Sequence, residues 1–221
     1  QGWDLAHFVR SLAKPAELPP PASALERGRR VVEARGCYAC HVIEGRGGKV
    51  GPSLDVAAQK LETAWVKDFL SGPRRYGKIY GVGFIPYRMP DLGLSADEID
   101  GIVALFAHTA GRPQPEPAPT RPHVDASRAP AGQLLYALKC AECHNLGNVI
   151  PLYEAKRQGP DLIKVAGRVR FDWVPGWIDD PKKILPDSRM VKTNLNADEI
   201  ESIRAFLWTV SAAEQAKEAQ K

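Results

Sequence analysis

The sequence predicts an all-α fold built as two similar units in tandem, joined by a proline-rich linker. Apolar residues recur at helical spacing, and strand signals are weak throughout. Two matching cysteine motifs begin 103 residues apart, at Cys37 and Cys140, and other elements recur around them in the same order. Six prolines fall within residues 112–130, a composition that favours an extended, semi-rigid connection.

Composition excludes several broad classes of function. The 221 residues carry 30 Lys and Arg against 26 Asp and Glu, and no basic run marks a nucleic-acid-binding face. The longest apolar runs, such as residues 102–107, are far shorter than the ~18–20 residues that span a bilayer. We therefore expect no nucleic-acid partner and no membrane span. Membrane association through a partner or through a removed upstream segment stays open.

Two pentapeptides share the pattern C-x-x-C-H, the attachment signature of a c-type haem. Their thiols would form thioethers with the two vinyl groups of one porphyrin, and the adjacent imidazole would bind the iron. The sequence therefore predicts two covalently bound haem c groups. The attaching and ligating residues would be Cys37, Cys40, His41, Cys140, Cys143 and His144.

Zinc binding and thiol redox chemistry are the rival interpretations of these cysteines. Paired C-x-x-C zinc sites usually have about 15–20 residues between the pairs, whereas 99 residues separate Cys40 from Cys140. A thioredoxin-like pair needs no following histidine and is expected beside a βαβ pattern, which is not visible here. A histidine follows both motifs, which favours haem.

Three elements surround each motif in the same order. A short helical stretch with a glycine precedes it, a Gly-Pro-x-Leu turn follows it, and a tryptophan-bearing segment comes next. In the first unit these elements are residues 25–35, 51–54 and 65–70. In the second they are residues 132–139, 159–162 and 173–178. Such a recurrence is typical of a tandem duplication.

The only two methionines of the chain occupy matched positions. Met89 lies 48 residues after His41, Met190 lies 46 residues after His144, and each follows an arginine. A methionine is often a filler of core gaps, but the matched placement predicts that both are sixth ligands of iron. A thioether ligand raises the potential relative to a second histidine.

Each unit is predicted to end in an amphipathic helix. Ser95 with Glu98, and Asn196 with Glu199, form the spacing of a capping box at the helix start. The apolar residues that follow recur at i, i+3 and i+6 or i+7, which indicates one buried helical face.

The order of these elements resembles that of class I c-type cytochromes, twice over. The resemblance implies that the first and last helices of each unit cross closely at Gly28 and at Gly132. It also implies that the carbonyls of Pro52 and Pro160 accept hydrogen bonds from the proximal imidazoles. A His/Met iron has six ligands and no open position for a substrate, so the resemblance implies electron transfer rather than catalysis.

The predicted boundaries divide the chain into five parts. The opening part would be a helix followed by a proline-rich break, and it is interpreted either as the end of an upstream domain or as an ordinary docking helix. A polar tail, interpreted as the fraying end of the last helix, would close the chain. The parts are residues 1–21, the unit 22–112, the linker 113–129, the unit 130–212 and the tail 213–221.

Other aromatic and histidine residues are secondary candidates. Five aromatic residues would pack on porphyrin or in the core: Trp65, Trp173, Trp177, Tyr80 and Tyr87. Three histidines are expected at solvated or surface positions and would become ligands only if the methionines are not: His7, His108 and His123.

The expected function is the transfer of single electrons between redox protein partners. Covalent haem attachment in bacteria implies the periplasmic side, with a signal peptide or an upstream segment absent from this chain. Within this class, a subunit or dedicated partner of a respiratory oxidoreductase is favoured over a free shuttle. A catalytic di-haem enzyme, of the peroxidase or thiosulfate-oxidising type, is the alternative. The linker has no apolar periodicity for docking, so a contact between the units should place them with their haem edges facing.

Overall fold

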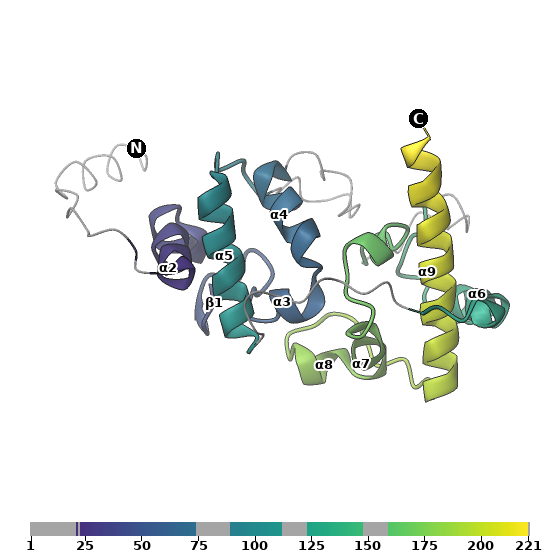
Figure 1. The fold of residues 1–221 in the computed structure, drawn as a ribbon. Helices are drawn as coiled ribbons and strands as arrows, with labels where there is room; N and C mark the ends of the chain where they lie inside the picture. The colour runs from purple at the N-terminus through teal and green to yellow at the C-terminus, as the bar shows by residue number, and fades with distance from the viewer. Residues whose placement is uncertain (1–20, 22, 74–88, 112–122, 148–158, 221) are drawn as a thin grey trace, which may run out of the picture.

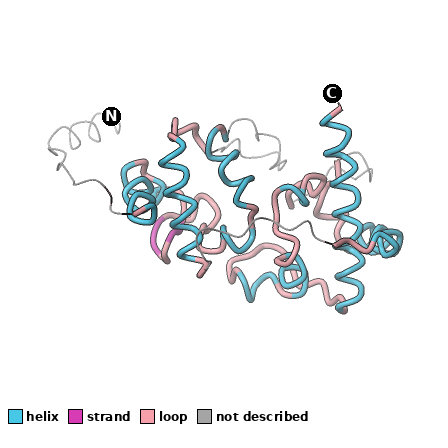
Figure 2. The backbone as a smooth tube through the Cα atoms, viewed as in Figure 1, coloured by secondary structure: helices cyan, strands magenta, loops and turns pink. Residues whose placement is uncertain are grey.

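The computed structural model describes residues 21, 23–73, 89–111, 123–147 and 159–220. These residues are mostly helical, with one small two-stranded sheet, and this confirms the all-α prediction (Figure 2). The predicted helix at the start of the chain, His7, Tyr80 and Tyr87 lie outside the described residues.

The first half of the molecule holds four α-helices and a short hairpin among its described residues. The hairpin pairs Val42 with Gly47 and Ile43 with Arg46. In chain order the elements are α2 (Ala24–Ala34), η1 (Cys37–Ala39), β1 (Val42–Ile43), β2 (Arg46–Gly47), α3 (Ala57–Lys60), α4 (Thr63–Ser71) and α5 (Ala96–Thr109).

The second half holds four α-helices and two 3-10 helices among its described residues. Its last helix is the longest described element of the chain. The elements are η3 (Ala126–Arg128), α6 (Ala129–Lys139), η4 (Val165–Gly167), α7 (Val174–Asp179), α8 (Pro181–Ile184) and α9 (Ala197–Ala219).

Capping boxes begin both long helices, as predicted. The Ser95 hydroxyl accepts from the Glu98 N–H at 3.2 Å, and the Glu98 carboxylate accepts from the Ser95 N–H at 2.8 Å. The Asn196 side chain and Glu199 make the same pair of bonds at 3.0 and 2.8 Å. Each box satisfies helix N–H groups that have no partner within the helix.

The first and last helices of each half cross at a glycine, which confirms the crossing expected at these positions. Figure 1 shows α2 and α6 each nearly end-on against an upright helix, α5 and α9. A Cβ atom at Gly28 would overlap the carbonyl of Gly101, and one at Gly132 would overlap the carbonyl of Ser202. The two backbones can approach this closely only because these glycines lack a side chain.

Each crossing lies over its own hydrophobic core. Val32, Ile102 and Leu105 lie in the first core, and each is at most 2% exposed. Tyr136 and Ile203 lie in the second core, and each is at most 1% exposed. The two cores are distinct clusters, with Leu61 packed against both.

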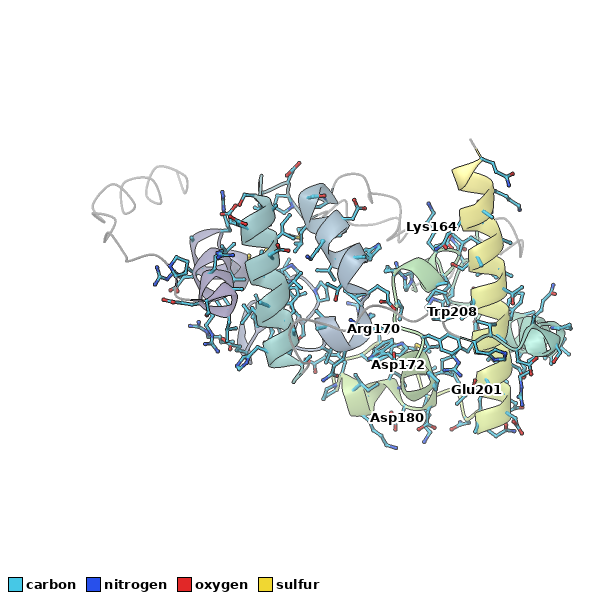
Figure 3. All side chains as sticks on the ribbon, viewed as in Figure 1. Lys164, Arg170, Asp172, Asp180, Glu201 and Trp208 are labelled. Carbon is cyan, nitrogen blue, oxygen red and sulfur yellow. The ribbon has the colours of Figure 1, made fainter. Side chains whose placement is uncertain are left out.

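The two halves are joined by backbone hydrogen bonds between residues 60–62 and 168–170. The Glu62 N–H donates to the Arg168 carbonyl and the Arg170 N–H donates to the Lys60 carbonyl, both at 2.9 Å. The guanidinium Nε of Arg170 donates to the carbonyls of Ala58 and Leu61 at 2.9 and 3.0 Å. Figure 3 shows Arg170 between the halves. This contact places the halves, as expected from a linker without apolar periodicity.

Helical structure extends into both segments that flank the second unit. It begins at Ala126, within the segment predicted as linker, where the Asp125 carboxylate accepts from the Ser127 N–H and Pro130 needs no acceptor in the first turn of α6. The polar tail continues α9 to Ala219, as expected for a helix end. The fully buried Ser211 hydroxyl accepts from the Ala166 N–H at 3.2 Å, which fixes α9 beyond its apolar part.

Among the described residues, no helix is both long enough and apolar enough to cross a bilayer.

Candidate haem sites

Each C-x-x-C-H motif forms a single helical turn directly after the first helix of its half. In the first half, Gly36 adopts φ +71°, which reverses the chain, and the His41 N–H donates to the Cys37 carbonyl at 3.0 Å. In the second half, α6 runs into Cys140, and the His144 N–H donates to the Cys140 carbonyl at 2.9 Å. The turn therefore presents a cysteine and the histidine four residues later on one side.

Both proximal imidazoles are oriented by a proline carbonyl. Nδ1 of His41 lies 2.8 Å from the carbonyl oxygen of Pro52, and Nδ1 of His144 lies 2.9 Å from that of Pro160. A carbonyl can only accept, so Nδ1 carries the proton and donates. The Nε2 lone pair of each ring is then available to a metal, as in most histidine–metal sites.

A glycine lies against each of these imidazoles. A Cβ atom at Gly51 would overlap the ring of His41, and one at Gly159 would overlap the ring of His144. The Gly51 N–H also donates to the Cys40 carbonyl at 2.7 Å, and the Gly159 N–H to the Cys143 carbonyl at 2.9 Å. The sequence analysis named the prolines and missed these glycines, although their recurrence in Gly-Pro-x-Leu was the available signal.

Two of the thiol environments do not favour disulfide exchange. Burial raises the pKa of the Cys37 thiol and raises that of Cys140 to about 11. Disulfide exchange proceeds through a thiolate, so a raised pKa slows it. Among the described residues, no group of three or more His, Cys, Asp and Glu could hold a metal ion. Thioether formation, in contrast, consumes the thiols.

The electrostatic environment of His144 suits a neutral ligand. The pKa of this imidazole is lowered, mainly because the ring is buried. The hydrogen bond to the Pro160 carbonyl acts in the opposite direction and raises it. A neutral imidazole is the form that binds a metal.

The two methionines lie in different surroundings. Met89 is half-buried and packs against the first core, as does Cys37. Met190 is half-buried, and its N–H donates to the Ser188 hydroxyl at 3.1 Å. Their role as sixth ligands stays a prediction. His108 and His123, the reserve candidates within the described residues, are both exposed.

Stacked aromatic rings occur in both halves. Trp65 stacks on Phe69 with ring centroids 4.9 Å apart, and Trp173 stacks on Trp177 at 4.7 Å. The indole Nε1 of Trp173 is buried and has no hydrogen-bond partner. An unpaired buried donor is costly, so it favours an acceptor supplied by a bound group. Haem fits this site, because its propionates are acceptors.

Tyr136 is a site residue that the sequence analysis missed. It is fully buried, and its hydroxyl donates to the carbonyls of His144 and Asn145, both at 3.1 Å. It occupies the fourth position after Gly132, where the first half has Val32 after Gly28. Alignment of the two repeats would have exposed this difference.

A comparison with protein-family models matches residues 25–110 to the cytochrome c family. The matched region contains the first C-x-x-C-H motif and Met89. Cytochrome c domains bind a covalently attached haem c and take part in haem-based electron transfer with redox protein partners. A comparison with curated proteins found no match to the chain.

The cytochrome c domain shows what each part of such a site does. Bound haem supplies a one-electron couple between Fe(II) and Fe(III). Cys37 and Cys40 would hold the porphyrin and His41 would offer Nε2 to the iron, while the Pro52 carbonyl accepts from Nδ1 of the same ring. Gly51 keeps the ring and the carbonyl close together. The same relations link His144, Pro160 and Gly159 in the second half.

Proposed function

We propose that the chain is a di-haem c-type cytochrome that passes single electrons between redox protein partners. One observation carries the proposal: the second half repeats the proximal site of the cytochrome c domain. Its C-x-x-C-H turn, its Nδ1-to-proline hydrogen bond and its glycine contact match those of the first half. Residues 129–219 would thus form a second cytochrome c domain.

The distal ligands in this proposal are Met89 and Met190. A His/Met iron has all six positions occupied and binds no substrate directly. Its two oxidation states keep the same ligands, which suits rapid electron exchange. A catalytic di-haem enzyme would need a replaceable ligand on one iron, and matched methionines in both halves disfavour it.

We further propose a periplasmic location and a role as subunit or dedicated partner of a respiratory oxidoreductase. The location rests on covalent haem attachment, which in bacteria takes place on the periplasmic side. The role rests on the contact between the halves, because two fixed haems would connect a donor on one face with an acceptor on another. The hydrogen bonds of Arg170 to the carbonyls of Ala58 and Leu61 support the proposal, because they link the two halves.

Denaturing mass spectrometry of the native protein tests the haem count. The expected mass is the polypeptide plus two haem groups. The double variant Cys140→Ser/Cys143→Ser should lose one haem mass, and Cys37→Ser/Cys40→Ser should lose the other. A native mass with a single haem, unaffected by the Cys140 and Cys143 changes, would restrict the function to the cytochrome c domain.

A further inference from the structure

A lysine of the first half lies on the aromatic pair of the second half. Nζ of Lys60 is 5.2 Å from the ring centroid of Trp173 and 5.3 Å from that of Trp177. Lys60 ends α3, while both tryptophans belong to the segment that forms α7. This contact adjoins the backbone bonds that join the halves, one of which uses the Lys60 carbonyl.

The surroundings of this ammonium group favour an anion. No carboxylate among the described residues pairs with Lys60, and Arg168 and Arg170 of the same interface are only 7% and 9% exposed. Burial and the nearby Arg168 lower the pKa of Lys60 to about 8. Cation–π contacts to two rings offset part of this cost, but a buried charge is normally paired with an opposite one.

The same interface presents a second unsatisfied group. The buried Nε1–H of Trp173 has no acceptor, and it belongs to the indole on which Lys60 rests. A carboxylate bound here would pair with the ammonium group and accept from the indole. Trp173 and Cys140 both pack against the second core. The haem expected at Cys140 carries two propionates, so it is the source of carboxylates expected in this half.

We propose that Lys60 binds a propionate of the haem held by the second half, together with Nε1 of Trp173. This inference rests on the proposed second haem. It makes the cofactor site of one half depend on a residue of the other. A positive charge beside this propionate favours the reduced state of that haem, so Lys60 would raise its potential and bias the electron toward it.

The test compares Lys60→Gln with Lys49→Gln in spectroelectrochemical titrations of the full-length holoprotein. Lys49 is a matched control, because it is also a first-half lysine that contacts the second half, through an exposed ion pair with Asp187 at 3.0 Å. Removal of Lys60 should shift the electron distribution between the two haems by about tenfold, away from the second haem. Lys60→Arg should keep the native distribution, and Lys49→Gln should leave it nearly unchanged.

The double variant Cys140→Ser/Cys143→Ser assigns the two redox waves, since only the first haem remains in it. Trp173→Phe should shift the same wave as Lys60→Gln, and the combined variant should shift it by less than the sum, because both residues bind one group. Equal effects of Lys60→Gln and Lys49→Gln would overturn the inference. A shift confined to the first haem would overturn it as well.

The haem count of the same samples, from denaturing mass spectrometry, separates this inference from the proposed function. A count of one haem per chain rejects the second haem and the propionate contact with it. A count of two with no specific effect of Lys60 rejects only the propionate contact.

Discussion

The two halves place the axial histidine in the same way but support it differently. In both, Nδ1 donates to a proline carbonyl at 2.8 to 2.9 Å, and a glycine lies against the ring. In the first half, the chain after His41 forms a short hairpin, in which Val42 pairs with Gly47. In the second half, the buried Tyr136 hydroxyl binds the carbonyls of His144 and Asn145 instead.

This difference shows which features the proximal site requires. The glycine is common to both halves because a side chain there would overlap the imidazole, and the proline carbonyl is common because it accepts from Nδ1. Among the described residues, Tyr136 supports the loop of the second half at the position where the first half has Val32. The halves also differ at the helix crossing, where Gly28 meets Gly101 but Gly132 meets Ser202.

We expect the largest loss of stability from adding a side chain where the first and last helices of each half cross. Gly132→Ala and Gly28→Ala each place a methyl group onto the backbone of the facing helix, so each should destabilise its own half by about 3 kcal/mol or more. Thermal unfolding followed at the haem absorbance measures this.

Gly176→Ala is the matched control for the crossing glycines. It lies within α7, and its added Cβ would make only ordinary contact with Ile184, at 3.8 Å. It should be neutral or slightly stabilising. Equal behaviour of Gly132→Ala and Gly176→Ala would contradict the close approach of α6 and α9.

The second prediction concerns the distal ligands. Met89→His and Met190→His should each lower one reduction potential and leave the other largely in place, because a second imidazole favours Fe(III) relative to a thioether. The loss of the sulfur-to-iron charge-transfer band of one haem should accompany each shift. If neither variant moves a potential, the methionines are not ligands, and His108 and His123 become the residues to replace.

The third prediction tests the support of the second site. Tyr136→Phe removes the hydroxyl donor to the His144 carbonyl and should destabilise the second half by about 1–3 kcal/mol, because that acceptor loses its partner while the Asn145 carbonyl keeps the Leu162 N–H. Denaturant unfolding monitored at both haems should show an early loss of the second. Val32→Ala, which changes the matched position of the first half, should weaken the first site instead. Coincident loss of both haems in Tyr136→Phe would show that the halves unfold as one unit.

The smallest effect is expected at the capping boxes and depends on pH. The hydrogen bond from the Ser95 N–H, and then Arg35, lower the pKa of Glu98 from 4.5. A lowered folded-state pKa means that Glu98 stabilises the protein above about pH 4.5 and that this contribution is lost as the pH falls through the folded pKa. Glu98→Gln should therefore reduce stability at pH 7 and have little effect near pH 3.

Glu199→Gln is the companion variant in the second half. Glu199 keeps the capping bond to Asn196, but no arginine among the described residues pairs with it as Arg35 pairs with Glu98. Urea unfolding at both pH values should give a smaller loss for Glu199→Gln than for Glu98→Gln. The reverse order would show that the ion pair with Arg35 contributes nothing to the first box.

The sequence alone predicts the features that depend on local spacing. The C-x-x-C-H turn, the capping boxes and the amphipathic last helices each rest on residues three or four apart, whose geometry follows from one helical turn. The crossing at Gly28 and Gly132, in contrast, is predicted only through the resemblance to class I c-type cytochromes. The start of α6 and the length of α9 depend on a side-chain cap from Asp125 and on a tertiary hydrogen bond to Ser211.

Tertiary structure decides the contacts between residues far apart in the chain. Arg170 donates hydrogen bonds to the carbonyls of Ala58 and Leu61, which lie more than a hundred residues earlier in the chain. No periodicity or motif in either segment predicts this pairing. The cation–π contact between Lys60 and Trp173 likewise forms only when the two halves pack against each other. Such contacts depend on the shapes of two packed surfaces, whereas a local motif depends only on the backbone of one turn.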